Sequence, residues 1–426
     1  MEHSTIAIII ILLAMVSFAL ERIPLVATAL LASLAMVLFG VMPVEEAYSG
    51  FGTNVVMMVA GMMIIGNALF ETGVAAKFGD AILHTRFARS EKSFMIMLMV
   101  VESTVLLFIN NSAIIALMIP IIAAVASRSN GKITLKNVLM PVAFVAVIRG
   151  GITMSGSTPQ VIGQTALTQI GLPQMGYFKL AWVGIPRTVM CIIYFATIGY
   201  ALEKKVFKFD DKIDQKLLTP STAGGGGFSK AKMWISSLVM AGSVIGFVSG
   251  TFSLGFWSLL GVTVLIATKC VTPKQAFGSV DWNTIGILGA AQGFATGLNV
   301  SGGGKVIAET MINTFGGVKA ASPLLITTLF IIITAVLTNI LSDTALAAIM
   351  CPIAANVAVS LGVSPYAMVI GVILATGGDF TPIATAGLTQ SLVGGYRFMD
   401  YVKVLVPLWV LLVITTVIFS PIAYPF

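Results

Sequence analysis

The chain of 426 residues is too hydrophobic for a soluble domain, because 57% of its residues are hydrophobic and only 10% are charged, against roughly 25% charged residues in soluble domains. Its mean hydropathy of +1.00 and its apolar runs of about 17–25 residues predict an all-α polytopic membrane protein. The three cysteines show no pairing pattern, and two histidines are too few for histidine-based catalysis or a His-rich metal site. We therefore expect neither an enzyme nor a resident cofactor, and the net charge of +7 does not by itself indicate nucleic acid.

The apolar runs predict ten transmembrane helices and two longer segments of a different kind. The N-terminal run lacks a basic n-region and a small-residue cleavage site, so we interpret it as a retained span rather than a signal peptide. The predicted spans are 5–20, 24–42, 54–72, the broken helix 138–170, 180–202, 233–250, 253–268, 283–300, the broken helix 366–395, and 404–422.

The first long segment, 94–127, is predicted to be a re-entrant hairpin. Basic residues flank it on both sides, namely Lys77, Arg86, Arg89 and Lys92 before it and Arg128, Lys132 and Lys136 after it. Because basic residues accumulate on the cytoplasmic side, both ends should face the cytoplasm. Two helical arms of about 16 residues, each about 24 Å long, fall short of two full crossings. The residues between the arms, 110–112, should therefore lie near mid-membrane, buried in protein or lining a cavity.

An internal repeat relates this hairpin to the second long segment, 322–361. When Pro120 is aligned with Pro352, the triplet Asn110-Asn111-Ser112 (the first tip) falls on Ser342-Asp343-Thr344 (the second tip). The first half should begin outside and the second inside, so the repeats should be inverted, a feature typical of secondary transporters. The predicted units are the repeat 1–202 with hairpin 94–127 and broken helix 138–170, the cytoplasmic linker 203–232, and the repeat 233–426 with hairpin 322–361 and broken helix 366–395.

Each hairpin is followed by a helix that Gly and Pro interrupt. The first break runs over 149–159 and the second over 377–387. An unwound helix offers carbonyl groups to a cation, and the N-termini of half-helices favour an anion. One tip and one break in each half therefore predict two cation sites around one anion site. The alternative is that Gly and Pro only kink ordinary spans.

These motifs resemble the divalent anion:sodium symporters, which have a Ser-Asn-Thr triplet at each hairpin tip and a Gly/Ala-Ser/Thr-Pro-Pro-Asn loop after it. The resemblance covers nearly the whole chain, including the closing sequence GGYRFMDYVKVLVPL. It implies Na⁺-coupled symport or anion exchange of dicarboxylates such as succinate, malate or fumarate, or of citrate or sulfate. It also implies a homodimer in the cell membrane and an elevator movement.

The resemblance and the charges near the site together give two sets of expected site residues. The expected substrate-binding residues are Asn110, Asn111, Ser112, Arg149, Ser157, Thr158, Pro159, Ser342, Asp343, Thr344 and Thr385. The expected cation-binding residues, which would hold Na⁺ or respond to H⁺, are Asn110, Asn111, Gly156, Ser342, Asp343, Asp379, Thr381 and Ala384.

The second half departs from the family pattern. Asp343 stands where the family has Asn, and the second loop lacks both prolines and the Asn. A carboxylate that faces an anionic substrate is repulsive unless it is protonated, paired or bound to a cation. Because ionisable residues at this depth are functional candidates, we hypothesise that Asp343, with Asp379 nearby, is a proton or cation site. A structural pair between Asp343 and Arg149 is the alternative.

Arg149 is the one cation predicted within the membrane near the site. The parallel N–H donors of its guanidinium suit a carboxylate substrate, but a buried ion pair with Glu102 or Asp379 is an equal alternative. A second function is also open, namely a cation/proton antiporter of the same superfamily in which Asp343 and Asp379 bind the ion. An intramembrane enzyme has no motif in its favour.

Overall fold

The computed structural model describes residues 2–20, 22–74, 77, 90–109, 111–129, 131–211, 229–314, 322–382 and 385–426. Within these ranges the chain is helical and contains no strand, as the composition predicts. Six of the described helices are long and apolar enough to cross a membrane, and several apolar helices of 10–17 residues accompany them. The prediction of an all-helical, multi-pass membrane protein is confirmed.

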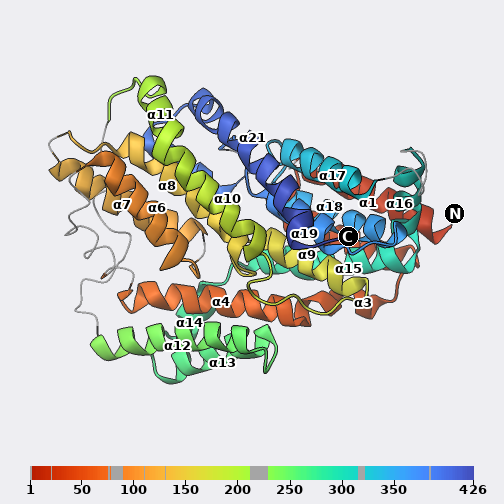
Figure 1. Cartoon of the computed structure of the whole chain (residues 1–426). Coiled ribbons are helices and arrows are strands. Elements are labelled where there is room, and N and C mark those ends of the chain that lie inside the picture. Colours follow the sequence, from red (N-terminus) through yellow and green to blue (C-terminus); the bar gives the residue numbers. More distant parts are fainter. Residues whose placement is uncertain are drawn as a thin grey trace.

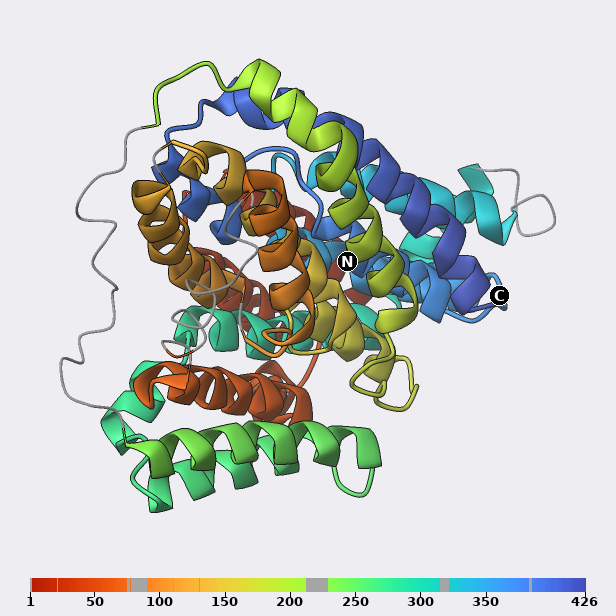
Figure 2. The same ribbon diagram turned by 60° about the vertical axis from the view of Figure 1, so that its left-hand side comes forward.

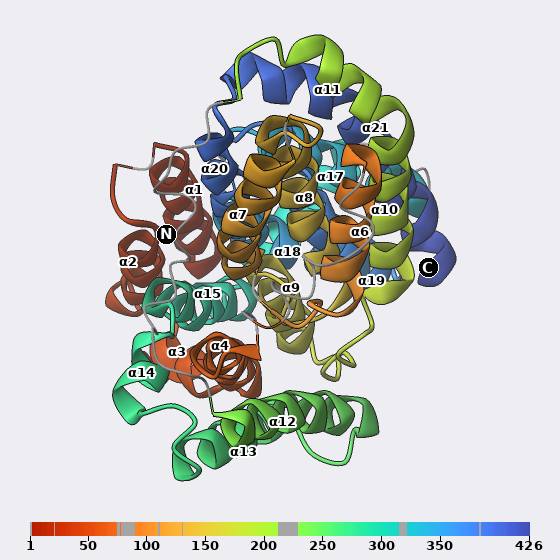
Figure 3. The ribbon, with the colours of Figure 1, turned by 90° about the vertical axis from the view of Figure 1, so that its left-hand side faces the viewer.

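One group of helices, here called the outer group, comes from the start of each half. Its members are α1 (His3–Leu20), α2 (Leu25–Leu38), α3 (Val44–Ser49), α4 (Asn54–Glu71), α12 (Lys230–Ser249), α13 (Leu254–Ala267), α14 (Pro273–Gly278) and α15 (Trp282–Val300). Within it, α4 packs against α13 and α2 packs against α15, so helices of the two halves lie side by side. The views in Figures 2 and 3 show α12 and α13 as a layer beyond α4.

The inner group contains both predicted hairpins and both broken helices. Its members are α6 (Glu91–Thr104), α7 (Asn111–Arg128), α8 (Leu135–Arg149), α9 (Thr158–Gln169), α10 (Ala181–Tyr194), α11 (Tyr200–Val206), α17 (Pro323–Leu337), α18 (Asp343–Ser360), α19 (Tyr366–Thr376), α20 (Ala386–Ser391) and α21 (Phe398–Ala423). The helix α16 (Gly303–Thr314) packs against α18 and α1 and thus connects the two groups.

The hairpins approach the middle of the inner group from opposite ends. Figure 1 shows α6 and α7 at the left of the molecule and α17 towards the right, near the two termini. The first arms, α6 and α17, have 14 and 15 residues, whereas α7 and α18 have 18 each and exceed the expected length. The relation of the halves as inverted repeats stays a prediction.

Both broken helices are interrupted at the expected places. α8 ends at Arg149, a 3-10 turn covers Gly150–Ile152, and α9 begins at Thr158 with Pro159 in its first turn, where proline suits the helix start. The break needs glycine at position 156, because a Cβ there would lie 2.0 Å from the carbonyl oxygen of Gly150. The second break separates α19 from α20, and its residues 383–384 lie outside the described ranges.

Helices extend into the predicted linker 203–232 from both sides. α11 continues to Val206 and α12 begins at Lys230, while residues 212–228 lie outside the described ranges. Just before that gap, the carboxylate of Asp211 accepts hydrogen bonds from the backbone N–H groups of Leu135 and Lys136 at 2.9 and 3.1 Å. An acidic side chain thus satisfies free N–H groups at the start of α8.

Candidate functional site

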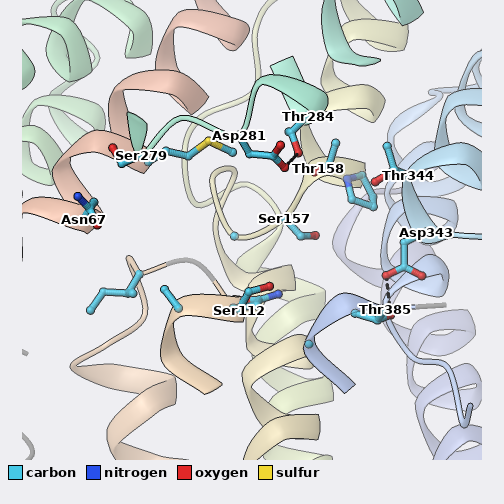
Figure 4. Close-up of a pocket in the computed structure, with 18 of the residues that line it drawn as sticks. Asn67, Ser112, Ser157, Thr158, Ser279, Asp281, Thr284, Asp343, Thr344 and Thr385 are labelled. Carbon is cyan, nitrogen blue, oxygen red and sulfur yellow. Dashed lines mark hydrogen bonds between the residues drawn. The ribbon is translucent and has the colours of Figure 1, made fainter. Parts of the chain in front are cut away.

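A cavity of about 540 Å³ lies between the inner and outer groups. Both tips, both breaks and the outer helices contribute to its wall (Figure 4). The lining residues expected from the sequence are Asn111, Ser112, Gly156, Ser157, Thr158, Pro159, Ser342, Asp343, Thr344 and Thr385. Asn110 and Ala384 lie outside the described residues. The structure therefore brings residues from both halves to one site, whereas their roles in binding stay predictions.

The second half joins its tip and its break through two carboxylates and one hydroxyl. The Oγ1 atom of Thr385 lies 2.9 Å from Oδ2 of Asp343 and 2.8 Å from each oxygen of Asp379. Asp379 is fully buried, whereas Asp343 lines the cavity. A hydroxyl carries one proton and can donate it to one carboxylate only. Asp379, which is fully buried, therefore competes with Asp343 for this one donor, whereas Asp343 also has the hydroxyl of Thr338 within hydrogen-bond distance.

Neutral side chains fix the remaining backbone of this half. Thr338 Oγ1 lies 2.8 Å from Oδ1 of Asp343 and 2.7 Å from the carbonyl oxygen of Thr376. The side-chain oxygen of Asn339 accepts a hydrogen bond from the backbone N–H of Phe380 at 2.8 Å. The backbone carbonyl oxygen of Asn339 accepts a hydrogen bond from the hydroxyl of Thr381 at 3.1 Å. The hydroxyl of Thr381, an expected cation ligand, is thus used to hold the tip to the break.

In the first half, a buried arginine holds the backbone of the tip to the broken helix. The guanidinium of Arg149 donates to the carbonyl oxygens of Leu106, Leu107 and Ile109 at 3.3, 2.8 and 2.8 Å. It also donates to Oδ1 of Asn111 at 3.3 Å. These acceptors belong to the turn that ends at the first tip.

Arg149 neither lines the cavity nor forms one of the expected ion pairs. The side chain is fully buried, and it is not among the residues that line the cavity, so the geometry gives no support to a substrate-facing role. It forms no ion pair with Asp343, Asp379 or Glu102, although its charge interacts electrostatically with Glu102. Burial explains the difference: α8 is enclosed on nearly all sides, so its terminal arginine finds its acceptors in the adjacent turn.

Side chains within the first break also bond to one another. The hydroxyl of Ser157 donates to Oε1 of Gln160, and the amide of Gln160 donates to the carbonyl oxygen of Gly150 at 3.1 Å. Gln160 thereby spans the break and fixes Ser157 at the cavity wall.

The opposite wall of the cavity was missed by sequence reasoning. It comes from α4 and from the start of α15, and Figure 4 shows Asn67, Ser279, Asp281 and Thr284 across from Ser112 and Thr385. The carboxylate of Asp281 accepts the hydroxyl of Thr284 at 2.5 Å and the backbone N–H of Asn283 at 3.0 Å. A polar amide within an apolar span, as at Asn67, was the one available signal.

The cavity wall has an unusual charge pattern for an anion site. It contains two carboxyl groups, Asp281 and Asp343, and no Lys, Arg or His among the described residues that line it. Positive potential comes instead from helix ends: α7, α9 and α18 begin at Asn111, Thr158 and Asp343, all at the wall. The N-terminus of a helix presents free N–H groups and about half a positive charge.

Comparisons with known proteins agree with this architecture. A model of the citrate transporter family, CitMHS, matches residues 15–373. The uncharacterized transporter YfbS of Escherichia coli (strain K12) is 28% identical over 190 residues, which are 45% of this chain and 31% of that protein, so the chain covers less than a third of that relative. The sodium-dependent dicarboxylate transporter SdcS of Staphylococcus saprophyticus is 20% identical over 384 residues, covering 82% of this chain and 72% of that protein.

A solved structure shows a similar fold. The YdaH transporter of Alcanivorax borkumensis superposes with a TM-score of 0.61 at 13% sequence identity, covering 97% of this chain and 98% of that one. The family match over residues 15–373 is to a family of membrane transporters, and the solved structure shows that the chain shares the fold of one. The chain belongs to the citrate transporter family, which is related to the divalent anion:sodium symporters within the ion transporter superfamily, so the resemblance seen in the motifs is confirmed.

Proposed function

We propose that this protein is a secondary active transporter of small di- or tricarboxylate anions, such as succinate, malate, fumarate or citrate, coupled to Na⁺ or H⁺ or working as an anion exchanger. The observation that carries the proposal is the cavity that receives both tips and both breaks. Membership of the citrate transporter family supports it, and so does similarity to a sodium-dependent dicarboxylate transporter.

The chemistry of the cavity suits a carboxylate. Its wall offers the amide of Asn111, the hydroxyls of Thr158 and Thr344, and the starts of α7, α9 and α18. Amide N–H groups, hydroxyls and helix N-termini donate hydrogen bonds to carboxylate oxygens without a net charge on the protein. Such a site releases its anion more readily than an arginine pair would, which suits a transporter that must bind and release on each cycle.

We place the binding site of the coupling cation in the second half. Asp343 and Asp379 share the hydroxyl of Thr385, and a proton or a cation between them would relieve the repulsion of the two carboxyl groups. A bound Na⁺ or proton would also cancel the repulsion between Asp343 and an incoming anion. The anion would then bind well only after the cation, which is the physical basis of coupled symport.

The test is uptake of radiolabelled succinate and citrate into proteoliposomes under an inward Na⁺ gradient, an inward proton gradient, and no gradient. We expect accumulation of at least one substrate under one cation gradient and little without a gradient. Uptake that is driven only by a preloaded internal dicarboxylate would favour exchange over symport.

The charge of the wall supports a second candidate, the cation/proton antiporter. Two carboxyl groups and no basic side chain among the described lining residues favour a cation. In that case Asp343 and Asp379 would bind the transported ion and no organic anion would be carried. A pH-sensitive dye inside the same proteoliposomes separates the two functions, because antiport changes the internal pH when Na⁺ alone is added outside.

We further propose that the inner group moves against the outer group during transport, in an elevator movement, and that the protein is a homodimer in the cell membrane. The position of the cavity between the two groups supports such a movement, since sliding one wall past the other would change the side from which the site is reached. Cross-linking of cysteine pairs placed across the boundary would test it.

A further inference from the structure

We infer that Arg149 is a positioning residue, whose guanidinium holds the first tip in its binding geometry without contacting the substrate. The inference deepens the proposed function and rests on it for the identity of the site. Four acceptors converge on this one side chain: three backbone carbonyl oxygens of the preceding turn and the side-chain oxygen of Asn111.

The turn needs such a partner because its carbonyl groups follow the end of a helix. α6 ends at Thr104, so the carbonyl oxygens of Leu106 and Leu107 lie in the turn beyond the helix, where that of Leu106 also accepts the backbone N–H of Ile109 at 3.0 Å. Leu106 and Ile109 are themselves buried, where a carbonyl group that loses a hydrogen bond is costly. A planar guanidinium with five N–H donors satisfies several acceptors at once, and its positive charge favours the negative end of a helix dipole. A lysine has three donors on one nitrogen atom and does not reach the same set.

The same side chain determines where the amide of Asn111 points. Asn111 begins α7, is 8% exposed and lines the cavity, so its orientation decides which group it presents there. Because Arg149 binds the Oδ1 atom of Asn111, the NH₂ group stays free to donate. A donor on the cavity side is what a carboxylate requires, whereas the opposite orientation would offer an acceptor.

Glu102 distinguishes this role from that of an ordinary ion pair. It is fully buried, neither of its carboxyl oxygens has a hydrogen-bond partner among the described residues, and it lies outside hydrogen-bond reach of Arg149. If the charge of Glu102 were what holds Arg149, then Glu102→Gln would disturb the tip as much as a change of the arginine. If the carbonyl groups and Asn111 hold it, Glu102→Gln leaves the tip in place.

The test measures the accessibility of the tip directly. The three native cysteines are buried, so Ala113→Cys, at a residue that lines the cavity, gives one site for a membrane-impermeant maleimide. We expect Arg149→Lys to raise the labelling rate about fivefold or more, since several hydrogen bonds to a charged group are lost. The matched control is Arg187→Lys, because Arg187 is also buried but, among the described residues, donates to the carbonyl oxygen of Gly377 alone, at 3.3 Å. In the control, as in Glu102→Gln, the labelling rate should stay within about twofold of the parent.

Transport kinetics supply the second readout. Arg149→Lys should raise KM for succinate or citrate by about tenfold, the equivalent of one hydrogen bond to a charged group, while Glu102→Gln leaves KM unchanged. A raised KM with unchanged labelling would mean that Arg149 binds the substrate itself, and this result overturns the inference. Faster labelling in Glu102→Gln also overturns it, and that variant decides the question even if Arg149→Lys fails to fold. If the unmodified protein carries neither substrate, the proposed function fails while the labelling still judges the role of Arg149.

Discussion

The two half-sites have the same architecture and different chemistry. In the first, the guanidinium of Arg149 behind the tip binds backbone carbonyl groups, and the described polar side chains of the tip and break at the cavity are an amide and hydroxyls. In the second, Thr338 and Asn339 hold the backbone, and two carboxyl groups share one hydroxyl at the wall. The first half-site therefore places no carboxyl group at the cavity among its described residues, whereas in the second Asp343 lines the cavity and Asp379 is buried beside it.

From this difference we propose separate tasks for the two halves. A pre-formed neutral site binds an anion with little rearrangement, while a pair of carboxyl groups changes its charge with the surrounding cation or proton concentration. A transporter that couples an anion to a cation gains from this separation, because each ligand then acts on its own half and they meet in one cavity. Four predictions test the assignment, in addition to that made for Arg149.

The largest effect is expected at the first break. In Gly156→Ala, the new Cβ would lie 2.0 Å from the backbone oxygen of Gly150, which cannot move aside, so we expect uptake to fall about a hundredfold. The control is Gly387→Ala in the second half, where the new Cβ would meet two side-chain methyl groups at 2.9 Å that can shift. Initial uptake rates should fall far less there. Equal losses of uptake in the two variants would show that the two breaks tolerate an added methyl group equally.

The next effect concerns the carboxyl groups of the second half. Asp343→Asn removes one charge from the shared network, so uptake should lose its dependence on the cation gradient, with a fall of about tenfold in the gradient-driven rate. Initial rates measured against external Na⁺ and pH check this. Asp281→Asn, at the other acidic residue of the wall, is the control and should keep the dependence. An Asp343→Asn variant that responds to Na⁺ and pH like the parent would refute the assignment of the cation to this half.

A smaller effect is expected at the shared hydroxyl. Thr385→Val keeps the size of the side chain and removes the proton that Asp343 and Asp379 share, so the concentration of cation giving half-maximal uptake should shift about fivefold. Thr385→Ser keeps the hydroxyl and should restore the parental value within about twofold. Failure of the serine variant to recover would mean that the methyl group, rather than the hydroxyl, matters.

The smallest effect is expected on the outer wall. Asp281 is exposed, so its charge acts on an approaching anion through solvent. Asp281→Asn should lower KM for a dicarboxylate by about twofold at low ionic strength, and the difference should vanish at high salt because exposed charges are screened. A salt-independent change in KM would indicate direct contact of Asp281 with the substrate instead.

The sequence by itself determined the membrane class, the approximate places of the long apolar helices, and the points at which α8 and α19 end, whereas the short helices α3, α14 and α16 lie outside every predicted span. These features follow from local patterns: apolar length sets a span, and Gly and Pro interrupt a helix wherever it lies. The internal repeat added one non-local statement, that the two tips belong together, and the cavity contains residues of both.

Only the tertiary structure decided which polar groups meet. The acceptors of Arg149 lie about 40 residues before it in the chain, and Thr385 lies 42 residues after Asp343. Asn67 and Asp281 reach the cavity from α4 and from the N-cap of α15, where the sequence predicted no site residue. Such contacts depend on how whole helices pack, and a buried charge takes whichever acceptors that packing places near it. Residue type thus predicted that Arg149 and Asp343 needed partners, and packing chose carbonyl groups for the first and two threonines for the second.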